Sequence, residues 1–323
     1  MIKAPIGGFY ELELPKVNNE FHKDAISLST GRSCISLILE KEKPTKVYIP
    51  FYTCSALYEP LMKYNINFEF YGIDETLEPT KLPTLRENEI FIYINYFGLK
   101  NEFCNNLINR YHSKVVIDNT HNFFHKGYDN TYSFTSARKY FGVPDGAYLY
   151  SPKEVEYKIY PRNKNISLLH NILRLEENYD TAYEKYLESE ALFSCDILRI
   201  SNISEKILKT IDYQEVKEKR IKNYNYLHKK LKNSNLLQIE YSSDAIPFCY
   251  PLLLSKKIEK RLFHQNNLFI PTLWPDILLR EDENHLFEKN FSQALIPIPI
   301  DHRYEINDMK NVIKIIKRII DEQ

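Results

Sequence analysis

Short apolar runs alternate with helix-like segments through the first half of the chain. The runs that read as strands are residues 46–50, 67–72, 89–95, 114–118, 131–135 and 147–150. Segments with a helical pattern of apolar positions, 55–64 and 102–111, separate some of these runs. Short strands joined by crossover helices are typical of a mostly parallel sheet with helices on its faces. We therefore predict an α/β fold, in which ligands bind beyond the carboxyl ends of the strands.

The second half of the chain has a different pattern. Residues 165–235 favour long helices whose exposed faces carry Lys and Glu. The elements expected after them are a strand near 248–254 and helices over 256–265 and 305–320. We predict a large α/β domain over 1–235, which includes the helical segment, and a smaller C-terminal α+β domain over 236–323.

Charge and composition narrow the class of protein. The 43 basic and 43 acidic residues cancel, whereas nucleic-acid-binding proteins usually carry an excess of Lys and Arg. The N-terminal residues lack the apolar core of a signal peptide, and no uncharged apolar stretch approaches the ~20 residues that cross a bilayer. We therefore expect a soluble, cytoplasmic protein that acts on small molecules and binds neither nucleic acid nor membrane.

The five cysteines are widely spread and include no C-x-x-C pair. An odd number at such spacings fits neither a disulfide framework nor a zinc site. We expect ordinary reduced thiols and no bound metal.

All eight glycines lie at or before Gly146, and glycine is used where the backbone approaches a ligand closely. In this half, Lys139 follows a strand-like run and the hydroxyl residues Thr135 and Ser136, and a glycine-containing turn comes after it. A lysine at a strand end beside phosphate-binding groups suits pyridoxal phosphate (PLP), because its amine forms a Schiff base with the cofactor aldehyde. The alternative is an ordinary surface lysine.

A small polar cluster runs into an apolar helix over residues 28–39. Free N–H groups at a helix N-terminus, together with the helix dipole, bind anions. Gly31, Arg32 and Ser33 are therefore candidates for holding a phosphate. The alternative is a simple N-cap by Ser29 or Thr30.

Asp118 ends a buried apolar run, and His121 follows shortly after it. A carboxylate at the end of a buried strand is costly unless it is paired. A pyridinium N–H is one such partner, and pairing there keeps the PLP ring protonated. The alternative is that Asp118 caps the next segment and that His121 is an ordinary satisfied polar residue. In the segment 47–55, Tyr52 either stacks on a planar ring or packs in the core.

Taken in order, these segments resemble the DegT/StrS-type sugar aminotransferases, which are PLP-dependent enzymes of fold type I, the aspartate-aminotransferase-like fold. The resemblance extends over nearly the whole chain. The matching segments are Ser-Thr-Gly-Arg-Ser-Cys-Ile at 29–35, Ile-Pro-Phe-Tyr-Thr at 49–53, Asp-Asn-Thr-His at 118–121, Ser-Phe…Lys at 133–139, Arg-Ile-Ser-Asn at 199–202 and Leu-Ile-Pro-Ile-Pro-Ile at 295–300.

The resemblance implies a role for each candidate residue. Lys139 resembles the lysine that carries the cofactor, Asp118 the partner of the pyridine nitrogen, and His121 the neighbour of the ring hydroxyl. The residues that resemble the phosphate site are Gly31, Arg32 and Ser33, with the hydroxyl of Ser133, Thr135 or Ser136. Lys139 and Asp118 are thereby the expected catalytic residues.

The chain departs from the family pattern in several places. The spacing from Ser133 to Lys139 is one residue longer than the family has, which leaves the phosphate-binding hydroxyl open. Cys54 stands where an aromatic residue usually stacks on the ring, so Tyr52 is the substitute candidate. Arg138, directly before the lysine, either binds phosphate or keeps the amine unprotonated by repulsion. The Asn-Tyr-Arg loop that crosses from a partner subunit is absent from this sequence.

The activity implied by the resemblance is transfer of an amino group from glutamate to a nucleotide-linked keto sugar in surface-polysaccharide biosynthesis, by a homodimer. One alternative is a PLP-dependent elimination (dehydratase) enzyme, and another is a non-catalytic paralogue that kept the fold. The sugar, the carbon that is aminated, the nucleotide and the contribution of a partner subunit stay open at this stage.

Overall fold

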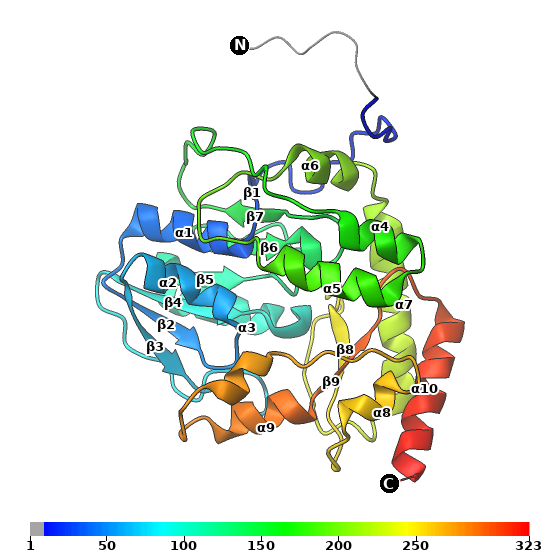
Figure 1. Ribbon diagram of the computed structural model, residues 1–323. Coiled ribbons are helices and arrows are strands. Elements are labelled where there is room, and N and C mark those ends of the chain that lie inside the picture. The colour runs from blue at the N-terminus through cyan, green and yellow to red at the C-terminus, as the bar shows by residue number, and fades with distance from the viewer. Residues whose placement is uncertain (1–9, 323) are drawn as a thin grey trace.

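A seven-stranded sheet forms the centre of the computed structural model, which describes residues 10–322 (Figure 1). In spatial order its strands are β1 (Ile26–Leu28), β7 (Ala147–Tyr150), β6 (Tyr132–Ser136), β5 (Val115–Asp118), β4 (Glu89–Ile94), β2 (Lys46–Pro50) and β3 (Asn67–Tyr71). All pairs from β3 to β6 are parallel, and β7 is antiparallel to both β6 and β1. The predicted α/β fold with a mostly parallel sheet is confirmed.

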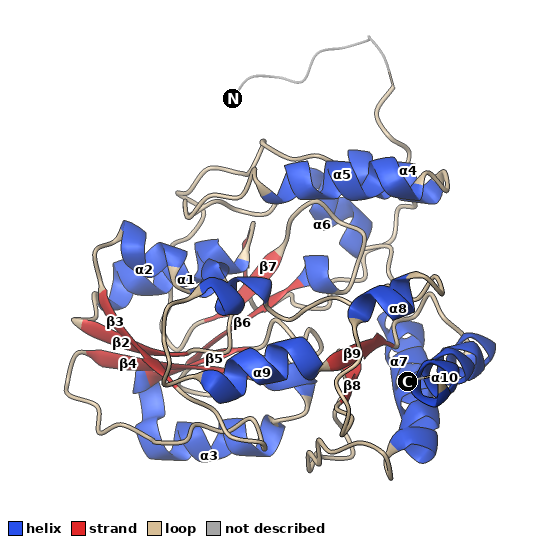
Figure 2. Cartoon of the chain, turned by 60° about the horizontal axis from the view of Figure 1, so that its bottom comes forward, coloured by secondary structure: helices blue, strands red, loops and turns tan. Residues whose placement is uncertain are grey.

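Helices cover both faces of this sheet. α1 (Gly31–Glu42) and α2 (Glu59–Lys63) lie on one side, and α3 (Asn101–Tyr111) lies on the other (Figure 2). Because both faces are covered, every residue of β4 and β5 is buried, as expected of parallel strands in the middle of an α/β sheet. Short 3-10 turns complete this half: η1 (Ser55–Leu57), η2 (Tyr96–Gly98), η3 (His112–Lys114) and η4 (Ala137–Lys139).

The helical segment predicted over 165–235 consists of separate helices. They are α4 (Leu169–Leu175), α5 (Tyr179–Glu190), α6 (Asn202–Leu208) and α7 (Tyr213–Leu231). α4 and α5 pack against each other as a hairpin. Arg138, which lies directly before Lys139, is ion-paired with Glu190 at the end of α5. The hairpin is therefore attached to the turn that carries Lys139.

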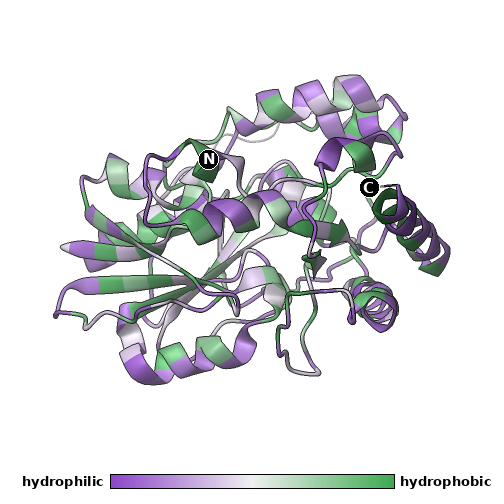
Figure 3. Cartoon of the chain, turned by 90° about the horizontal axis from the view of Figure 1, so that it is seen from below, coloured by the Kyte–Doolittle hydropathy of each residue, from purple (hydrophilic) through white to green (hydrophobic). Residues whose placement is uncertain are grey.

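The C-terminal part contains a two-stranded antiparallel sheet of β8 (Cys249–Leu252) and β9 (Ile296–Pro299). The remaining elements are α8 (Lys260–His264), η5 (Pro275–Leu279), α9 (Leu286–Ala294) and α10 (Ile306–Asp321). α7 packs against both β8 and α10. One side of α10 is apolar, as its colours show in Figure 3, and it buries Met309, Val312, Ile313, Ile316 and Ile319.

The domain division after residue 235 stays a prediction. Residues 1–9 and 323 lie outside the described part of the chain, so the expectation about the N-terminal segment also stays a prediction. Among the described residues, no helix is long and apolar enough to cross a membrane.

Candidate active site

Asp118 and Lys139 both lie at the carboxyl edge of the sheet. Asp118 is the last residue of β5 and is paired with Phe134 on the neighbouring parallel strand β6. Lys139 ends the 3-10 turn that directly follows β6. Thr120 links the two, since its backbone N–H donates to Asp118 Oδ1 (2.8 Å) and its Oγ1 accepts from Lys139 Nζ at 3.5 Å. This is the edge at which parallel α/β sheets bind ligands.

The Asp118 carboxyl group is buried, whereas the Lys139 side chain is exposed. Burial raises the pKa of Asp118, and the nearby positive charge of Lys139 offsets part of that rise. Within residues 10–322, no Arg, Lys or His makes an ion pair with Asp118. A buried carboxylate in this situation is stabilised by a cationic N–H donor.

His121 is held in an aromatic stack beside this pair. Its ring is parallel to those of Phe248 (centroids 4.4 Å apart, 3° between planes) and Trp274 (5.6 Å, 10°). Its Nδ1 accepts a hydrogen bond from the Phe97 backbone N–H at 3.4 Å. Burial, and next the charge of Lys139, lower the pKa of His121 well below its usual value. The imidazole is therefore neutral, and because Nδ1 is an acceptor, its one N–H is on Nε2.

The N-terminus of α1 abuts the segment after Asp118. A Cβ placed on Gly31 would lie 3.5 Å from the Phe134 ring and 3.9 Å from Thr120 Cγ2. Thr30 is the N-cap, because its Oγ1 accepts from the Ser33 backbone N–H at 3.2 Å. The simple N-cap that was the alternative prediction for this segment is therefore formed, and Thr30 provides it. The first N–H groups of the helix, at Gly31 and Arg32, have no acceptor within the helix.

The side chains of Arg32 and Ser33 have other partners. The Arg32 guanidinium is ion-paired with Glu59. The Ser33 hydroxyl is buried and donates to the Asp196 carbonyl at 2.6 Å. Their predicted part in phosphate binding is therefore limited to the backbone of the helix N-terminus.

Strand alternation separates the candidate hydroxyls of β6. Phe134 is in register with Asp118, and Ser133 is in register with Ile117. Because successive side chains of a strand point to opposite faces, Ser136 shares the face of Phe134, which contacts Gly31 of α1. Ser133 and Thr135 are on the other face. The Ser133 hydroxyl is buried without a partner, and the Thr135 hydroxyl donates to Asn119 O at 2.8 Å. The register favours Ser136 as the phosphate ligand.

Comparison with known proteins shows which solved structures share the fold of this chain. No family model and no curated protein matches the sequence. Solved structures do match. One is a DegT DnrJ EryC1 StrS aminotransferase from Brucella abortus (12% identity, 92% of this chain and 88% of that chain covered, TM-score 0.63). Another is the sugar aminotransferase CalS13 from Micromonospora echinospora (12% identity, 91% and 87% covered, TM-score 0.63).

A third is the putative sugar aminotransferase Spr1654 from Streptococcus pneumoniae in its PLP form (10% identity, 95% and 92% covered, TM-score 0.64). The chain has the aminotransferase fold. At these identities the likeness establishes the fold, and the chemistry rests on the residues themselves.

The residues of this aminotransferase fold fit PLP. The unpaired, buried carboxylate of Asp118 matches a pyridine nitrogen that carries a proton. The amine of Lys139 lies next to it, and the N-terminus of α1 with the Ser136 hydroxyl provides donors for a phosphate. His121 adds one neutral N–H donor. The donor set therefore suits each polar group of that cofactor.

Tyr52 lies in the core of the aminotransferase fold. It is fully buried, and its ring packs edge-on against Trp274 (4.9 Å) and Phe291 (5.1 Å). Of the two roles predicted for Tyr52, these contacts support packing in the core. Cys54 is only half-buried, and its pKa is raised by burial and lowered by the charge of Lys139. Of these two residues after β2, only Cys54 has a pKa that is lowered by the charge of Lys139.

Arg138 is engaged on the side away from the lysine, by α5 and the residues after it. Its guanidinium pairs with Glu190 and lies 4.1 Å from the ring centroid of Phe193. The positive charge is therefore neutralised on the side of α5. Arg138 joins the α4–α5 hairpin to the lysine turn.

Asp145 is a site-supporting residue that sequence reasoning missed. It is fully buried, and its carboxylate accepts hydrogen bonds from the Ser201 backbone N–H (3.0 Å), the Ser201 hydroxyl (2.6 Å) and the Ser204 hydroxyl (2.5 Å). Its neighbour Gly146 donates a backbone hydrogen bond to Ser29 at 2.6 Å. The loop after Lys139 is thus fixed at both α6 and the start of α1. The Arg-Ile-Ser-Asn segment was the available signal, because it contains Ser201.

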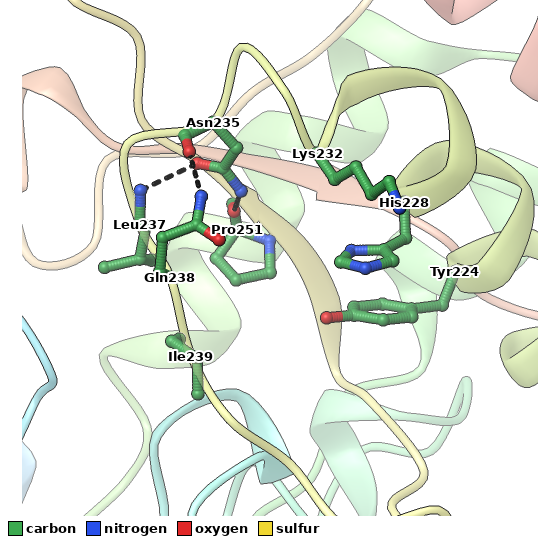
Figure 4. Close-up of a pocket in the computed structure, with 8 residues that line it drawn as sticks. All are labelled: Tyr224, His228, Lys232, Asn235, Leu237, Gln238, Ile239 and Pro251. Carbon is green, nitrogen blue, oxygen red and sulfur yellow. Dashed lines mark hydrogen bonds between the residues drawn. The ribbon is translucent and has the colours of Figure 1, made fainter.

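A hollow lies away from this site, between α7 and the segment after it, as Figure 4 shows. Its lining includes Tyr224, His228 and Asn235. The Asn235 amide is engaged within the protein, since it donates to Pro251 O (2.9 Å) and accepts from the N–H groups of Leu237 (3.1 Å) and Leu253 (2.9 Å). The polar groups there hold the loop together.

Among residues 10–322, no group of His, Cys, Asp and Glu is arranged to hold a metal ion. The five cysteines are free thiols, and Cys34, Cys104 and Cys249 are buried.

Proposed function

We propose that this protein is a PLP-dependent aminotransferase that moves an amino group from glutamate to a keto sugar. The observation that supports this most directly is the buried, unpaired Asp118 carboxylate beside the Lys139 amine at the carboxyl edge of the sheet. The solved structures with the same fold include proteins described as sugar aminotransferases, which favours a sugar as the acceptor.

When bound, PLP supplies an electron sink for the substrate carbon. The Asp118 carboxylate would hold the proton on the pyridine nitrogen, and its burial would strengthen that interaction. Lys139 Nζ would hold the cofactor and would take up the proton lost by the donor Cα. The lysine turn is short and is closed by a hydrogen bond from Tyr140 N to Ala137 O (2.9 Å), which fixes the backbone that carries the amine.

Two further groups orient the cofactor. The N-terminus of α1 and the Ser136 hydroxyl would hold the phosphate, and His121 would donate its Nε2–H to the ring hydroxyl. A neutral histidine suits this role because it adds no positive charge next to the Lys139 amine. The resemblance in the sequence extends the proposal to a nucleotide-linked sugar, to surface-polysaccharide biosynthesis and to the cytoplasm.

We also propose that two copies associate through the α4–α5 hairpin. Its exposed residues include several large apolar ones, with Leu175 at 80%, Tyr183 at 63% and Ile172 at 53% of their full accessible area. Exposed apolar side chains gathered on one element favour an association surface. The Arg138–Glu190 pair attaches the same hairpin to the lysine turn, so the proposed interface lies next to the active site.

The proposed function is tested by adding glutamate to the PLP-loaded protein. We expect one equivalent of 2-oxoglutarate and conversion of the visible absorbance band to that of pyridoxamine phosphate. A PLP band that persists with no keto acid formed would instead count against transfer and favour an elimination enzyme. A protein that takes up no PLP would indicate a non-catalytic paralogue.

The lysine is tested by borohydride reduction and peptide mass mapping. The wild type is expected to carry the reduced cofactor on Lys139. Lys139→Ala is expected to lose that adduct and at least about 10³-fold in turnover, because it removes both the covalent tether and the group that moves the proton. Lys153→Ala is the matched control, since Lys153 is an exposed lysine paired with Glu42 at the surface. An adduct on another lysine, or full turnover in Lys139→Ala, contradicts the assignment.

A further inference from the structure

Arg220 is a buried cation with an unusual set of contacts. It lies on α7 with only 1% of its area exposed. Within residues 10–322, no carboxylate makes an ion pair with it, and Asp301, whose charge acts on it, is bound to Arg303 at 2.7 and 2.9 Å. Its Nη1 donates instead to the carbonyls of Pro247 (3.3 Å) and Phe248 (3.0 Å), and its Nε has no partner. Burying a guanidinium without a carboxylate partner is unfavourable, so stability alone does not account for its contacts.

Through these contacts Arg220 reaches the segment that carries Lys139 and the segment that packs against His121. The guanidinium carbon lies 4.4 Å from the ring centroid of Tyr140, the residue directly after Lys139. The backbone that it holds at Phe248 carries the ring that stacks on His121 at 4.4 Å. The Phe248 N–H in turn donates to Phe97 O at 2.8 Å, and Phe97 N–H donates to His121.

We propose that Arg220 is a positioning residue for the cofactor site, an inference that rests on the proposed function. It fixes the Tyr140 ring behind the lysine turn and fixes Phe248 against His121. It thereby ties helix α7 to the groups proposed to surround the cofactor. Arginine suits this task because its planar fork binds carbonyls at its edge while its face lies on an aromatic ring, which a lysine ammonium cannot do.

A matched control lies on the same helix. Asn223 is also 1% exposed, and its Nδ2 donates to the carbonyls of Ile300 (3.2 Å) and Tyr304 (2.9 Å). Arg220 and Asn223 therefore make the same kind of contact, from a buried side-chain N–H to two backbone carbonyls. Only Arg220 contacts the segments that hold Lys139 and His121.

The test compares Arg220→Met, Arg220→Lys and Asn223→Ala with the wild type. PLP affinity is measured by titrating the visible absorbance band, and the midpoint of thermal unfolding is measured without PLP. Arg220→Met and Asn223→Ala are both expected to lower the midpoint. Arg220→Met is expected to weaken PLP binding about tenfold, and Asn223→Ala by less than about twofold, as for the loss of a group that orients the residues around a bound cofactor.

Arg220→Lys keeps the positive charge and provides a folded variant if Arg220→Met does not accumulate. It is expected to weaken PLP binding about threefold, because it restores a donor without the flat contact on Tyr140. Wild-type PLP affinity in either folded Arg220 variant overturns the inference, as does an equal loss of affinity in Asn223→Ala. A wild-type protein that forms no PLP band removes the proposed function itself, and this inference with it.

Discussion

The pKa of the Asp118 carboxyl group is raised because the group is buried, and the charge of Lys139 and the hydrogen bonds from Thr120 offset only part of that rise. A folded-state pKa above the unfolded value, 3.8, means that the folded protein binds the proton more tightly. The stability from this group is therefore present at low pH and is lost as pH rises through the folded pKa. In the absence of cofactor, the ionised form is a source of instability at neutral pH.

Asp118→Asn is expected to separate stability from activity. Without PLP, the variant should unfold at a higher temperature than the wild type at pH 7, and the difference should shrink as pH falls towards 4, because the wild-type carboxyl then protonates. Turnover should fall at least about 100-fold, since a neutral amide does not hold a proton on the pyridine nitrogen. Thermal unfolding across pH and steady-state rates check both parts. A variant that is less stable than the wild type at pH 7 would contradict this account.

The serines of β6 provide a matched pair. Ser136→Ala is expected to weaken PLP binding about tenfold, the effect of losing one hydrogen bond to a charged group. Ser133→Ala removes a buried hydroxyl that has no partner, so PLP affinity should not change and the protein should be no less stable. Absorbance titration of both variants measures this difference. A larger loss in Ser133→Ala would mean that the face assignment along β6 is wrong.

Individual residues were predictable to different degrees. Lys139 and Asp118 each end an apolar run at a strand terminus, so their pairing at one sheet edge follows from sequence. The choice among the hydroxyls of β6 depends on which face of the sheet α1 covers, and local sequence does not contain that information. Tyr52 and Cys54 are separated by a tight turn after β2, and only the folded turn determines which of them enters the core.

At the scale of elements, the loop after Lys139 depends on α6. Asp145→Asn is expected to reduce thermal stability by about 2 kcal/mol, because one amide oxygen cannot replace both carboxylate oxygens and its NH₂ group faces donors. Unfolding monitored by circular dichroism gives this value. Asn163→Ala is the milder control, since it removes only one donor (3.1 Å) to the same carboxylate. Equal stabilities of the two variants would contradict the proposed anchoring of this loop.

Elements with a strong local sequence pattern were predicted well, whereas elements that form through long-range strand pairing were not. The buried strands β4 and β5 are continuous apolar runs, which sequence reasoning recognises. β1 consists of only Ile26–Leu28 and exists because it pairs with β7, so it has no local signal. β9 lies in a Pro-rich stretch and forms where β8 offers it a partner. Proline is tolerated there because this sheet has only edge strands.

At the scale of the whole molecule, the hairpin α4–α5 determines the predicted assembly. The wild type is expected to have twice the chain mass of 38.5 kDa in light scattering after size exclusion. Leu175→Glu combined with Tyr183→Glu should shift it to the mass of one chain, because charges replace the apolar contacts. Leu279→Glu is the control, since Leu279 is 85% exposed but lies on η5. A monomeric wild type would contradict the dimer.

The position of β1 at the sheet edge has a consequence for how the protein is made. β1 and α1 precede their partners by a long stretch of chain, because within residues 10–322 β1 pairs with β7, at Ala147–Tyr150, and Leu28 forms a bridge with Arg199. Closing so long a loop is slow, so the first segment waits unpaired while more than a hundred further residues are synthesised. The N-terminus of α1, which we propose to hold the cofactor phosphate, is therefore assembled late, and we expect nascent chains cut before Tyr150 to retain no vitamin B6.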